Sequence, residues 1–319
     1  MRLGALELAS AYLLSPLESV SDAAFRRLCW SLGAGFTWTE MIRARGLVRN
    51  NKSTIDLIDS FDADVPTGVQ LMVANEKELA EALAKLDALA ASTHPHFRNL
   101  RAVDLNFGCP SPEVIRVGAG PALLKRHHKL RAIFEVLQAW KKTTALPIGA
   151  VTAKIRLGLN RAELDQQVFL PIVELANELL DGLTVHARHA REESTTPAHW
   201  EAFAEIRRRA TVPIIGNGDV VSIEAARRVM EGFGCDGVMV ARGAIRSPWI
   251  FRELTGRGAG LPTVAELDAA QNEWTRRATE LGSKPKYFEW HAEGFRRLRA
   301  RLSGAAASGP ELPSNEHMR

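Results

Sequence analysis

The chain has 319 residues, enough for one large barrel or for two ordinary domains. Hydrophobic residues make up 46% and charged residues 24%, and no run of about 18 apolar residues occurs, which argues against a membrane span. The net charge of +4 is too small to indicate a polyanionic partner by itself. Residues 1–7 lack the pattern of a secretory leader, so we expect a cytoplasmic protein.

The cysteines and histidines give no sign of a disulfide framework or a metal site. Cys29, Cys109 and Cys235 lie far apart without paired spacing. The histidines at 94 and 96 and at 127–128 have no acid or cysteine set nearby, and we interpret them as surface residues. We therefore expect no metal.

Short β-rich runs alternate with helical patterns along most of the chain. Eight strands are predicted, at residues 8–14, 35–39, 66–72, 102–107, 150–155, 182–186, 213–215 and 237–240. Helices are predicted between them, at residues 21–32, 76–91, 128–142, 166–180, 200–209 and 223–231. Asp22, Asn75 and Ser222 stand where a side-chain oxygen can cap a helix.

This rhythm predicts an α/β fold, a closed (β/α)8 TIM barrel with a small C-terminal helical domain. An open doubly wound sheet is the structural alternative. Glycines and prolines between residues 248 and 262 precede two further helical stretches, 264–281 and 287–302. We expect a barrel domain at 1–255, a helical domain at 256–302 and a disordered tail at 303–319.

In a barrel of this kind the active site is built at the carboxyl ends of the strands. The predicted strand ends are rich in polar and glycine residues: Ser15-Pro16-Leu17-Glu18, Gln70, Asn106, Cys109, Lys154, Arg156, His186, Arg188, Gly216-Asn217-Gly218-Asp219 and Ala241-Arg242-Gly243. Glycine-rich loops after the last two strands leave backbone N–H groups accessible, a pattern typical of a phosphate site. Together these residues favour a phosphorylated cofactor.

Cys109 is the most informative of these residues. It follows a buried apolar strand, with Asn106 and Gly108 before it and Pro110 after it, so its thiol is expected at the rim, where proton transfer takes place. The alternative is a small apolar cysteine of the core.

Other strand-end residues also have structural alternatives. Lys154 could extend its ammonium group past the barrel rim into water, and His186 could be a hydrogen-bonded imidazole of the core. Residues 216–219 could be a simple turn. No G-x-G-x-x-G pattern opens a helix after a strand, so a Rossmann nucleotide site is not supported.

The C-terminal helical stretches are basic. Between Glu273 and Leu302, eight lysines and arginines face four glutamates, which fits either an RNA-binding face or an ordinary solvated surface. Four aromatic residues lie in the same region and could stack on bases or form the helical core: Trp274, Tyr287, Phe288 and Trp290.

Taken in order, these motifs resemble those of the flavin-dependent tRNA-dihydrouridine synthases over most of residues 11–300. The residues that carry the resemblance are Ser15-Pro16-Leu17-Glu18-Ser19-Val20-Ser21-Asp22-Ala23-Ala24-Phe25-Arg26, Gln70-Leu71, Asp104-Leu105-Asn106-Phe107-Gly108-Cys109-Pro110, Gly118-Ala119-Gly120, Leu123-Leu124-Lys125, Lys154-Ile155-Arg156-Leu157-Gly158, Val185-His186-Ala187-Arg188, Asn217-Gly218-Asp219, Ala241-Arg242-Gly243-Ala244 and Pro248-Trp249-Ile250-Phe251.

The resemblance implies an FMN-bearing barrel that reduces the C5–C6 double bond of a uridine in tRNA, with NADPH as the reductant. Hydride would pass from reduced FMN to C6, and Cys109 would give its proton to C5. By the same resemblance, cofactor binding falls to Pro16, Leu17, Gln70, Lys154, His186, Asn217, Gly218, Asp219, Ala241, Arg242 and Gly243. Uracil and RNA would contact Asn106, Arg156, Arg188, Lys284, Lys286, Arg296 and Arg297. We expect a monomer without membrane attachment.

The chain departs from the family pattern in places. Leu17 and Ser19 replace a usual methionine and glycine, and residues 186–190 replace a more usual His-Gly-Arg-Thr run. These departures leave open which uridine is modified. Three alternatives therefore remain: a synthase acting on ribosomal RNA, a dihydroorotate-dehydrogenase-like FMN oxidoreductase acting on a free pyrimidine, and a non-enzymatic RNA-binding chaperone with a vestigial barrel.

Overall fold

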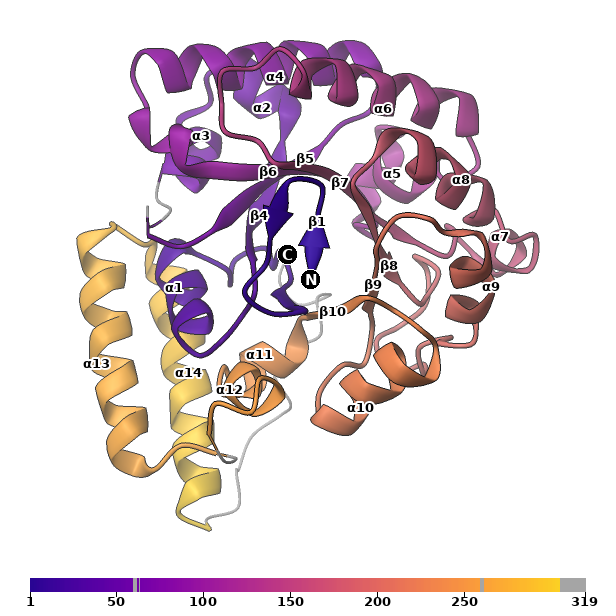
Figure 1. Cartoon of the computed structure of the whole chain (residues 1–319). Coiled ribbons are helices and arrows are strands. Elements are labelled where there is room, and N and C mark those ends of the chain that lie inside the picture. Colours follow the sequence, from indigo (N-terminus) through magenta and orange to yellow (C-terminus); the bar gives the residue numbers. More distant parts are fainter. Residues whose placement is uncertain (60–61, 63, 259–260, 305–319) are drawn as a thin grey trace.

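The computed structural model describes residues 1–59, 62, 64–258 and 261–304 and forms a barrel of parallel strands (Figure 1). The barrel strands are β3 (Tyr12–Leu14), β4 (Thr37–Arg43), β5 (Thr67–Met72), β6 (Leu100–Phe107), β7 (Ala150–Arg156), β8 (Gly182–His186), β9 (Ile214–Asn217) and β10 (Gly237–Val240). Their order is β3-β10-β9-β8-β7-β6-β5-β4. A parallel bridge between Leu13 and Phe36 joins β3 to the start of β4 and closes the ring. The predicted barrel is confirmed, and the open doubly wound sheet is wrong.

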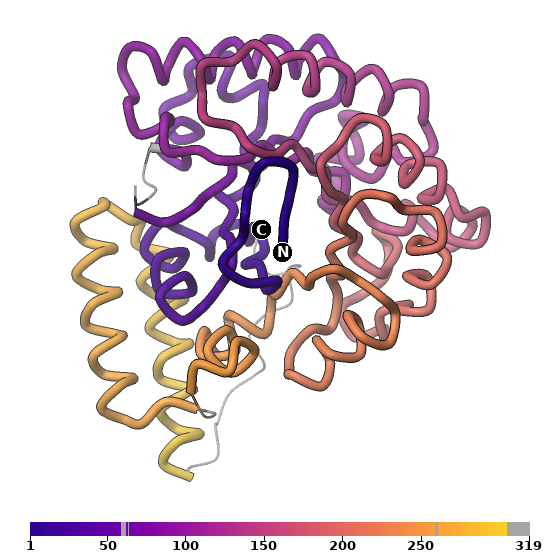
Figure 2. The backbone as a smooth tube through the Cα atoms, viewed as in Figure 1, coloured from indigo at the N-terminus to yellow at the C-terminus, as the bar shows by residue number. Residues whose placement is uncertain are grey.

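Helices surround the barrel (Figures 1 and 2). They are α1 (Ala23–Ser31), α2 (Ala44–Val48), α3 (Lys52–Asp59), α4 (Glu76–Ala91), α5 (Pro112–Arg116), α6 (His127–Lys141), α7 (Arg161–Asp165), α8 (Leu170–Leu179), α9 (Ala202–Arg209), α10 (Ile223–Arg227), α11 (Arg242–Arg246) and α12 (Ile250–Leu254). The three predicted caps are present: Asp22, Asn75 and Ser222 accept backbone N–H bonds at the starts of α1, α4 and α10. No described helix is long and apolar enough to cross a membrane.

Several predicted boundaries are wrong. The helix expected at 166–180 begins only at Leu170, because Gln167 adopts a positive φ of 51° that interrupts helical geometry. The helix expected at 223–231 ends at Arg227 and continues as a wider π-type turn over Arg228–Gly232.

The N-terminus also differs from the prediction. The expected strand at 8–14 is reduced to Tyr12–Leu14, because the preceding residues form a hairpin of β1 (Arg2–Leu3) and β2 (Leu6–Glu7). The hairpin turn bonds to the barrel through Ala5 N–H and Gly149 C=O, 2.9 Å apart. Its apolar side chains pack with residues at the amino ends of the strands, in a buried cluster of Leu3, Leu8, Leu13, Phe36, Trp38, Ala102, Ala150, Ile215 and Met239. The hairpin therefore plugs the barrel at its amino end.

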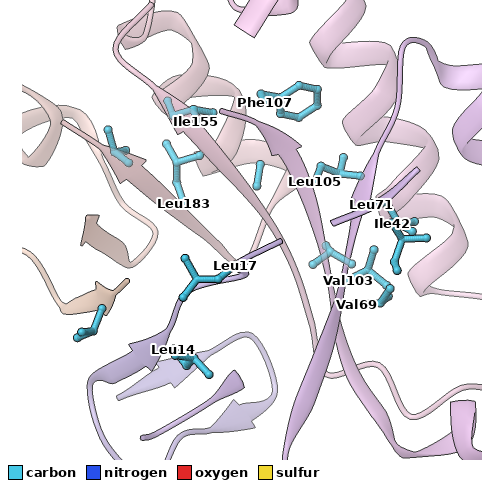
Figure 3. Packing of buried hydrophobic residues seen from close by; sticks show 14 of the residues in the cluster. Leu14, Leu17, Ile42, Val69, Leu71, Val103, Leu105, Phe107, Ile155 and Leu183 are labelled. Carbon is cyan, nitrogen blue, oxygen red and sulfur yellow. The ribbon is translucent and has the colours of Figure 1, made fainter. Parts of the chain in front are cut away.

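Strand alternation decides which side chains enter the barrel. On β6, Val103, Leu105 and Phe107 pack outward among the helices, as Figure 3 shows for the cluster they share with Leu71 and Ile155. The intervening residues of each strand point inward, because side chains alternate along a strand. Near the carboxyl ends the inward positions hold Gln70, Asp104, Asn106, Thr152, Lys154, Arg156, Thr184, His186 and Asn217.

The C-terminal part of the described chain is a helical pair, α13 (Val264–Glu280) and α14 (Pro285–Leu302), which lies beside α1 in Figures 1 and 2. Trp274 is buried and packs against Phe288, His291 and Phe295 across the pair. Trp274 and Phe288 therefore form part of the helical core. Of the predicted disordered tail, residues 305–319 lie outside the described residues.

Candidate active site

Polar side chains gather inside the barrel at its carboxyl end. Four neighbouring strands, β5 to β8, supply Gln70, Asn106, Lys154 and His186 from inward positions. In the strand register Gln70 pairs with Asp104, Asn106 with Lys154, and Arg156 with His186. The structure thus brings the predicted residues of these strands together at one rim.

A directed chain of hydrogen bonds runs from the barrel interior to the Cys109 loop. Asp104 accepts bonds of 2.7 Å from the Thr152 hydroxyl and from the Gln70 amide nitrogen. The Gln70 oxygen accepts a bond of 2.7 Å from the Asn106 amide. The Asn106 oxygen in turn accepts the N–H groups of Gly108 at 3.1 Å and Cys109 at 2.9 Å. Because a carboxylate only accepts, it fixes the orientation of both amides and of the loop.

Cys109 lies in the loop between β6 and α5 and is partly exposed, so it is not a core cysteine. Burial raises the pKa of its thiol above the ordinary value, and the charge of Glu18 acts in the same direction. The guanidinium groups of Arg156 and Arg43 oppose this shift in pKa. At neutral pH the thiol is therefore protonated, the form that a proton donor requires.

Two buried cations stand behind this thiol. Burial and the charge of Arg156 together lower the pKa of Lys154 to about 8, against the opposing effect of Asp104. The ammonium group of Lys154 makes no hydrogen bond to any described residue. Arg156 bonds through Nε to the carbonyl of Gly108 at 2.9 Å and through Nη1 to that of His189 at 3.1 Å. Arg156, expected to bind RNA, thus also anchors the Cys109 loop.

His186 faces the same interior and is neutral. Burial and the charges of Arg156, Lys154, Arg188 and Arg242 hold the pKa of His186 well below its ordinary value. A neutral imidazole has one donor and one acceptor nitrogen, so it can bond to a neutral polar group of a ligand.

Arg188 is placed differently from the expected RNA contact. Only 2% of its side chain is exposed, and Nη2 bonds to both carboxylate oxygens of Asp219 at 2.7 Å. Its remaining nitrogens reach the Thr196 carbonyl and His186. Asp219 also accepts Nη2 of Arg242 at 2.7 Å. Arg188 is therefore an internal support that holds Asp219, which in turn orients the half-exposed Arg242.

The loops after β9 and β10 present unpaired backbone donors beside Arg242. Gly218 is buried, yet its N–H and that of Asp219 bond to none of the described residues. Gly218 has a φ of 110°, which an L side chain rarely adopts. Arg242 and Gly243 form the first turn of α11, where N–H groups have no helical partner. This donor set fits a phosphate group.

The remaining cofactor candidates are less directly placed. Pro16 is half-buried, and the Leu17 side chain belongs to the outer core, so only its backbone is left for a ligand. The Leu17 N–H is already bonded to the Ser21 hydroxyl at 2.9 Å. Asn217 is buried and bonds through its amide to the Met239 carbonyl. Ala241 lies between β10 and α11, next to Arg242.

The four predicted RNA-binding residues of the helical pair differ in their surroundings. Lys284 stands at the N-cap position of α14 without a side-chain capping bond, and Lys286 donates a 2.7 Å bond to the Ser19 hydroxyl. Arg296 and Arg297 both pair with Glu293. Among the described residues, no cluster of three or more histidines, cysteines and acids could hold a metal ion.

The sequence prediction did not single out two buried acids. Asp104 stands within a quoted motif, and its alternation with Asn106 on one strand was a signal that both point inward. Glu40 joins β4 to α14 through Tyr287, a contact that no local sequence pattern reveals.

The structure defines a protein of the (β/α)8-barrel class, with a partly exposed cysteine and a set of unpaired backbone donors at the carboxyl end of the barrel. Solved structures share this fold: morphinone reductase has a TM-score of 0.53 at 14% identity, covering 81% of this chain and 89% of that one. The 6-hydroxypseudooxynicotine amine oxidase of Pseudomonas geniculata N1 has a TM-score of 0.61 at 12% identity, covering 81% of this chain and 48% of that one.

The sequence comparisons identify the family. The family model for dihydrouridine synthase (Dus) matches residues 13–289. A probable tRNA-dihydrouridine synthase of Aquifex aeolicus is 35% identical over 241 residues, 76% of this chain and 71% of the relative. The tRNA-dihydrouridine synthase B of Pseudomonas aeruginosa is 34% identical over 256 residues, 80% of this chain and 71% of the relative. The chain belongs to the dihydrouridine synthase family, and the resemblance seen in its motifs is confirmed.

Proposed function

We propose that this protein is an FMN-dependent synthase that converts a uridine of tRNA to dihydrouridine, with NADPH as the reductant. The observation that carries the proposal is the partly exposed, protonated thiol of Cys109 at the same barrel rim as a cradle for phosphate. The curated relatives, named as tRNA-dihydrouridine synthases, support the choice of substrate.

The residues at the rim fit FMN. Its phosphate would meet the free N–H groups of Gly218, Asp219 and Gly243 and the guanidinium of Arg242, since unpaired donors beside a cation suit a dianion. The Lys154 ammonium, with Gln70 and His186 beside it, would face the polar edge of the ring system. When bound, reduced FMN supplies the hydride equivalent for C6 of uracil.

The protein's own part is to hold the uracil and to deliver a proton. Asn106 has its oxygen occupied by the Cys109 loop and its amide nitrogen bonded to Gln70, so the thiol is held at a fixed place on the rim. Cys109 then donates its proton to C5. Because burial raises the pKa of the thiol, the thiol remains protonated at neutral pH and can act as the proton donor.

We assign residues 1–255 to catalysis and residues 256–302 to tRNA binding. Lys284 and the arginines of α14 would follow phosphates, while the target base leaves its stack to enter the barrel. Ion pairs with Glu293 keep Arg296 and Arg297 ordered on the helix surface. Phosphate contacts would make binding weaken with salt.

The test measures dihydrouridine in an unmodified tRNA transcript incubated with the purified protein, FMN and NADPH. Native protein should form product, Cys109→Ala almost none, and the matched control Cys235→Ala should retain activity. Equal product from the native protein and Cys109→Ala would remove Cys109 from the acid role. Bound flavin without product on tRNA would redirect the assay to ribosomal RNA or free pyrimidines, and failure to bind flavin would favour an RNA-binding protein without catalysis.

A further inference from the structure

The helical pair contacts the loop between β3 and α1 with four side chains. This loop, residues 15–22, forms one wall of the barrel mouth. Lys286 Nζ donates to the Ser19 hydroxyl at 2.7 Å, and His291 Nε2 donates to the Val20 carbonyl at 2.9 Å. The Ser283 hydroxyl donates to Asp22, and the His291 ring stacks on Phe25 with ring centroids 4.5 Å apart. The fourth side chain, Tyr287, reaches the loop through an intermediary.

That intermediary is Glu40, an almost fully buried residue of β4. One carboxylate oxygen accepts the backbone N–H of Ser19 at 2.5 Å, and the other accepts the hydroxyl of Tyr287. A single carboxylate therefore ties α14 to the backbone of the β3–α1 loop. The Glu40 side chain forms no hydrogen bond or ion pair with any described residue assigned to the flavin, so the proposed chemistry gives it no role.

The loop needs such support at Ser19. Its φ is 64°, a left-handed conformation that is unfavourable for a residue other than glycine and persists where neighbouring groups hold it. Glu40 accepts a hydrogen bond from the Ser19 N–H, and Lys286 donates one to the Ser19 hydroxyl. Both supports lie outside the loop, and one of them comes from the helical pair.

Close packing holds part of the loop, because Leu17 and Val20 are buried in the core, whereas Ser19 is partly exposed. A cavity of about 300 Å³ lies at the junction of the loop, β4 and the helical pair, lined in part by Asp22, Arg26, Glu40, Ser283 and Tyr287. The hydrogen bonds of Ser19 therefore fix the part of the loop that core packing does not cover.

The loop also reaches the reaction centre. Glu18, next to Ser19, lies near enough to Cys109 for its charge to add to the effect of burial in raising the pKa of the thiol. Movement at Ser19 therefore moves a charge that acts on the Cys109 thiol.

We propose that Glu40 is a positioning residue that couples the helical pair to Cys109, by fixing the β3–α1 loop through Ser19 and Tyr287. RNA seated on α14 would then stabilise the wall of the mouth in which the base reacts. The involvement of RNA rests on the proposed function, whereas the coupling within the protein does not.

The first arm of the test measures the rate of Cys109 alkylation by iodoacetamide, followed by mass spectrometry, in full-length protein without flavin or RNA. Glu40→Gln leaves one acceptor oxygen for two donors, and Tyr287→Phe removes one donor while keeping the buried ring. Each variant should raise the rate roughly tenfold, as expected for the loss of a hydrogen bond to a charged group. The double variant should be no faster than the faster single variant, since both changes break one connection.

Matched controls are Glu81→Gln, on the exposed face of α4, and Tyr12→Phe, whose hydroxyl bonds to none of the described residues. Both should alkylate at the native rate. If Glu40→Gln and Tyr287→Phe also alkylate at the native rate, the proposal is overturned.

The second arm uses unmodified tRNA with FMN and NADPH. The coupling predicts a lower kcat at saturating tRNA with an unchanged Kd for tRNA. A weaker Kd with unchanged kcat would mean that these residues only build the RNA surface, and would overturn the coupling. If native protein forms no dihydrouridine, the proposed function fails. The alkylation arm alone then tests whether Glu40 positions the loop beside Cys109.

Discussion

Asp104 should make the native protein less stable as the pH rises from acidic to neutral. Its side chain is 1% exposed, and burial raises the pKa of its carboxyl to about 6, against opposing hydrogen bonds from Thr152 and Gln70. In the unfolded chain the pKa is about 3.9. Between these values the native state binds more protons than the unfolded state, so the free energy of unfolding falls with rising pH. The difference in pKa corresponds to roughly 3 kcal/mol, lost by neutral pH.

The substitution Asp104→Asn isolates this effect because asparagine does not titrate. Relative to the native protein, the variant should gain roughly 2 kcal/mol between pH 4 and pH 7, because the unfolded carboxyl is already partly ionised at pH 4. A second effect is constant with pH: asparagine offers one acceptor oxygen to two donors, the Gln70 amide and the Thr152 hydroxyl, a conflict that costs on the order of 1–3 kcal/mol. The sign of the change with pH therefore does not depend on how large the conflict is.

Urea unfolding of both proteins at pH 4, 5, 6 and 7 measures the difference directly. Glu81→Gln, an exposed change on α4, serves as the control and should give a difference that is flat with pH. If the difference for Asp104→Asn is also flat, burial does not raise the pKa of Asp104, and the reasoning from its burial to the pH dependence of stability is refuted.

Three further predictions concern cations. Burial lowers the pKa of Lys154 to about 8, so between pH 8 and 10.5 the unfolded chain binds a proton that the native protein has lost. The free energy of unfolding should therefore rise by roughly 3 kcal/mol over this pH range. Urea unfolding of Lys154→Met should show no such rise. Arg242→Met should weaken FMN binding by about tenfold with little loss of stability, whereas Arg188→Met should lower the free energy of unfolding by about 2–4 kcal/mol. Flavin fluorescence titration measures the first effect and urea unfolding the second. The reverse pattern would contradict the roles assigned to the two arginines. Lys284→Met should lower the slope of log Kd against log salt for tRNA by about one, and an unchanged slope would remove Lys284 from the phosphate contacts.

The sequence predicted the barrel because its strands are short, apolar and regularly spaced. Val103, Leu105 and Phe107 on β6 make one such apolar run, and in the structure they face the helices. Polar residues near the strand ends, Asn106 and Lys154 among them, were expected at the mouth, where these two pair in register. Parallel strands in a closed ring bring their carboxyl ends together, so the site followed from the fold.

Contacts between distant segments were beyond prediction. The connection from Glu40 to Tyr287 joins residues 247 positions apart, and neither residue stands in a local motif. The resemblance led us to expect Arg188 to face RNA. A sequence does not show that the guanidinium of Arg188 forms an ion pair with Asp219. The N-terminal hairpin was missed because its strands are only two residues long.

That hairpin has a consequence for the order in which the chain acquires its structure. Leu3 packs over Gly182, and the Met1 sulfur occupies the space beside Gly237, so both contacts join residues far apart in the sequence. During synthesis residues 1–8 emerge long before β8 and β10, and their apolar side chains have no barrel to enter until those strands exist. The hairpin therefore docks late in folding. We expect its amide protons to gain protection from hydrogen exchange only after the strand ring has formed.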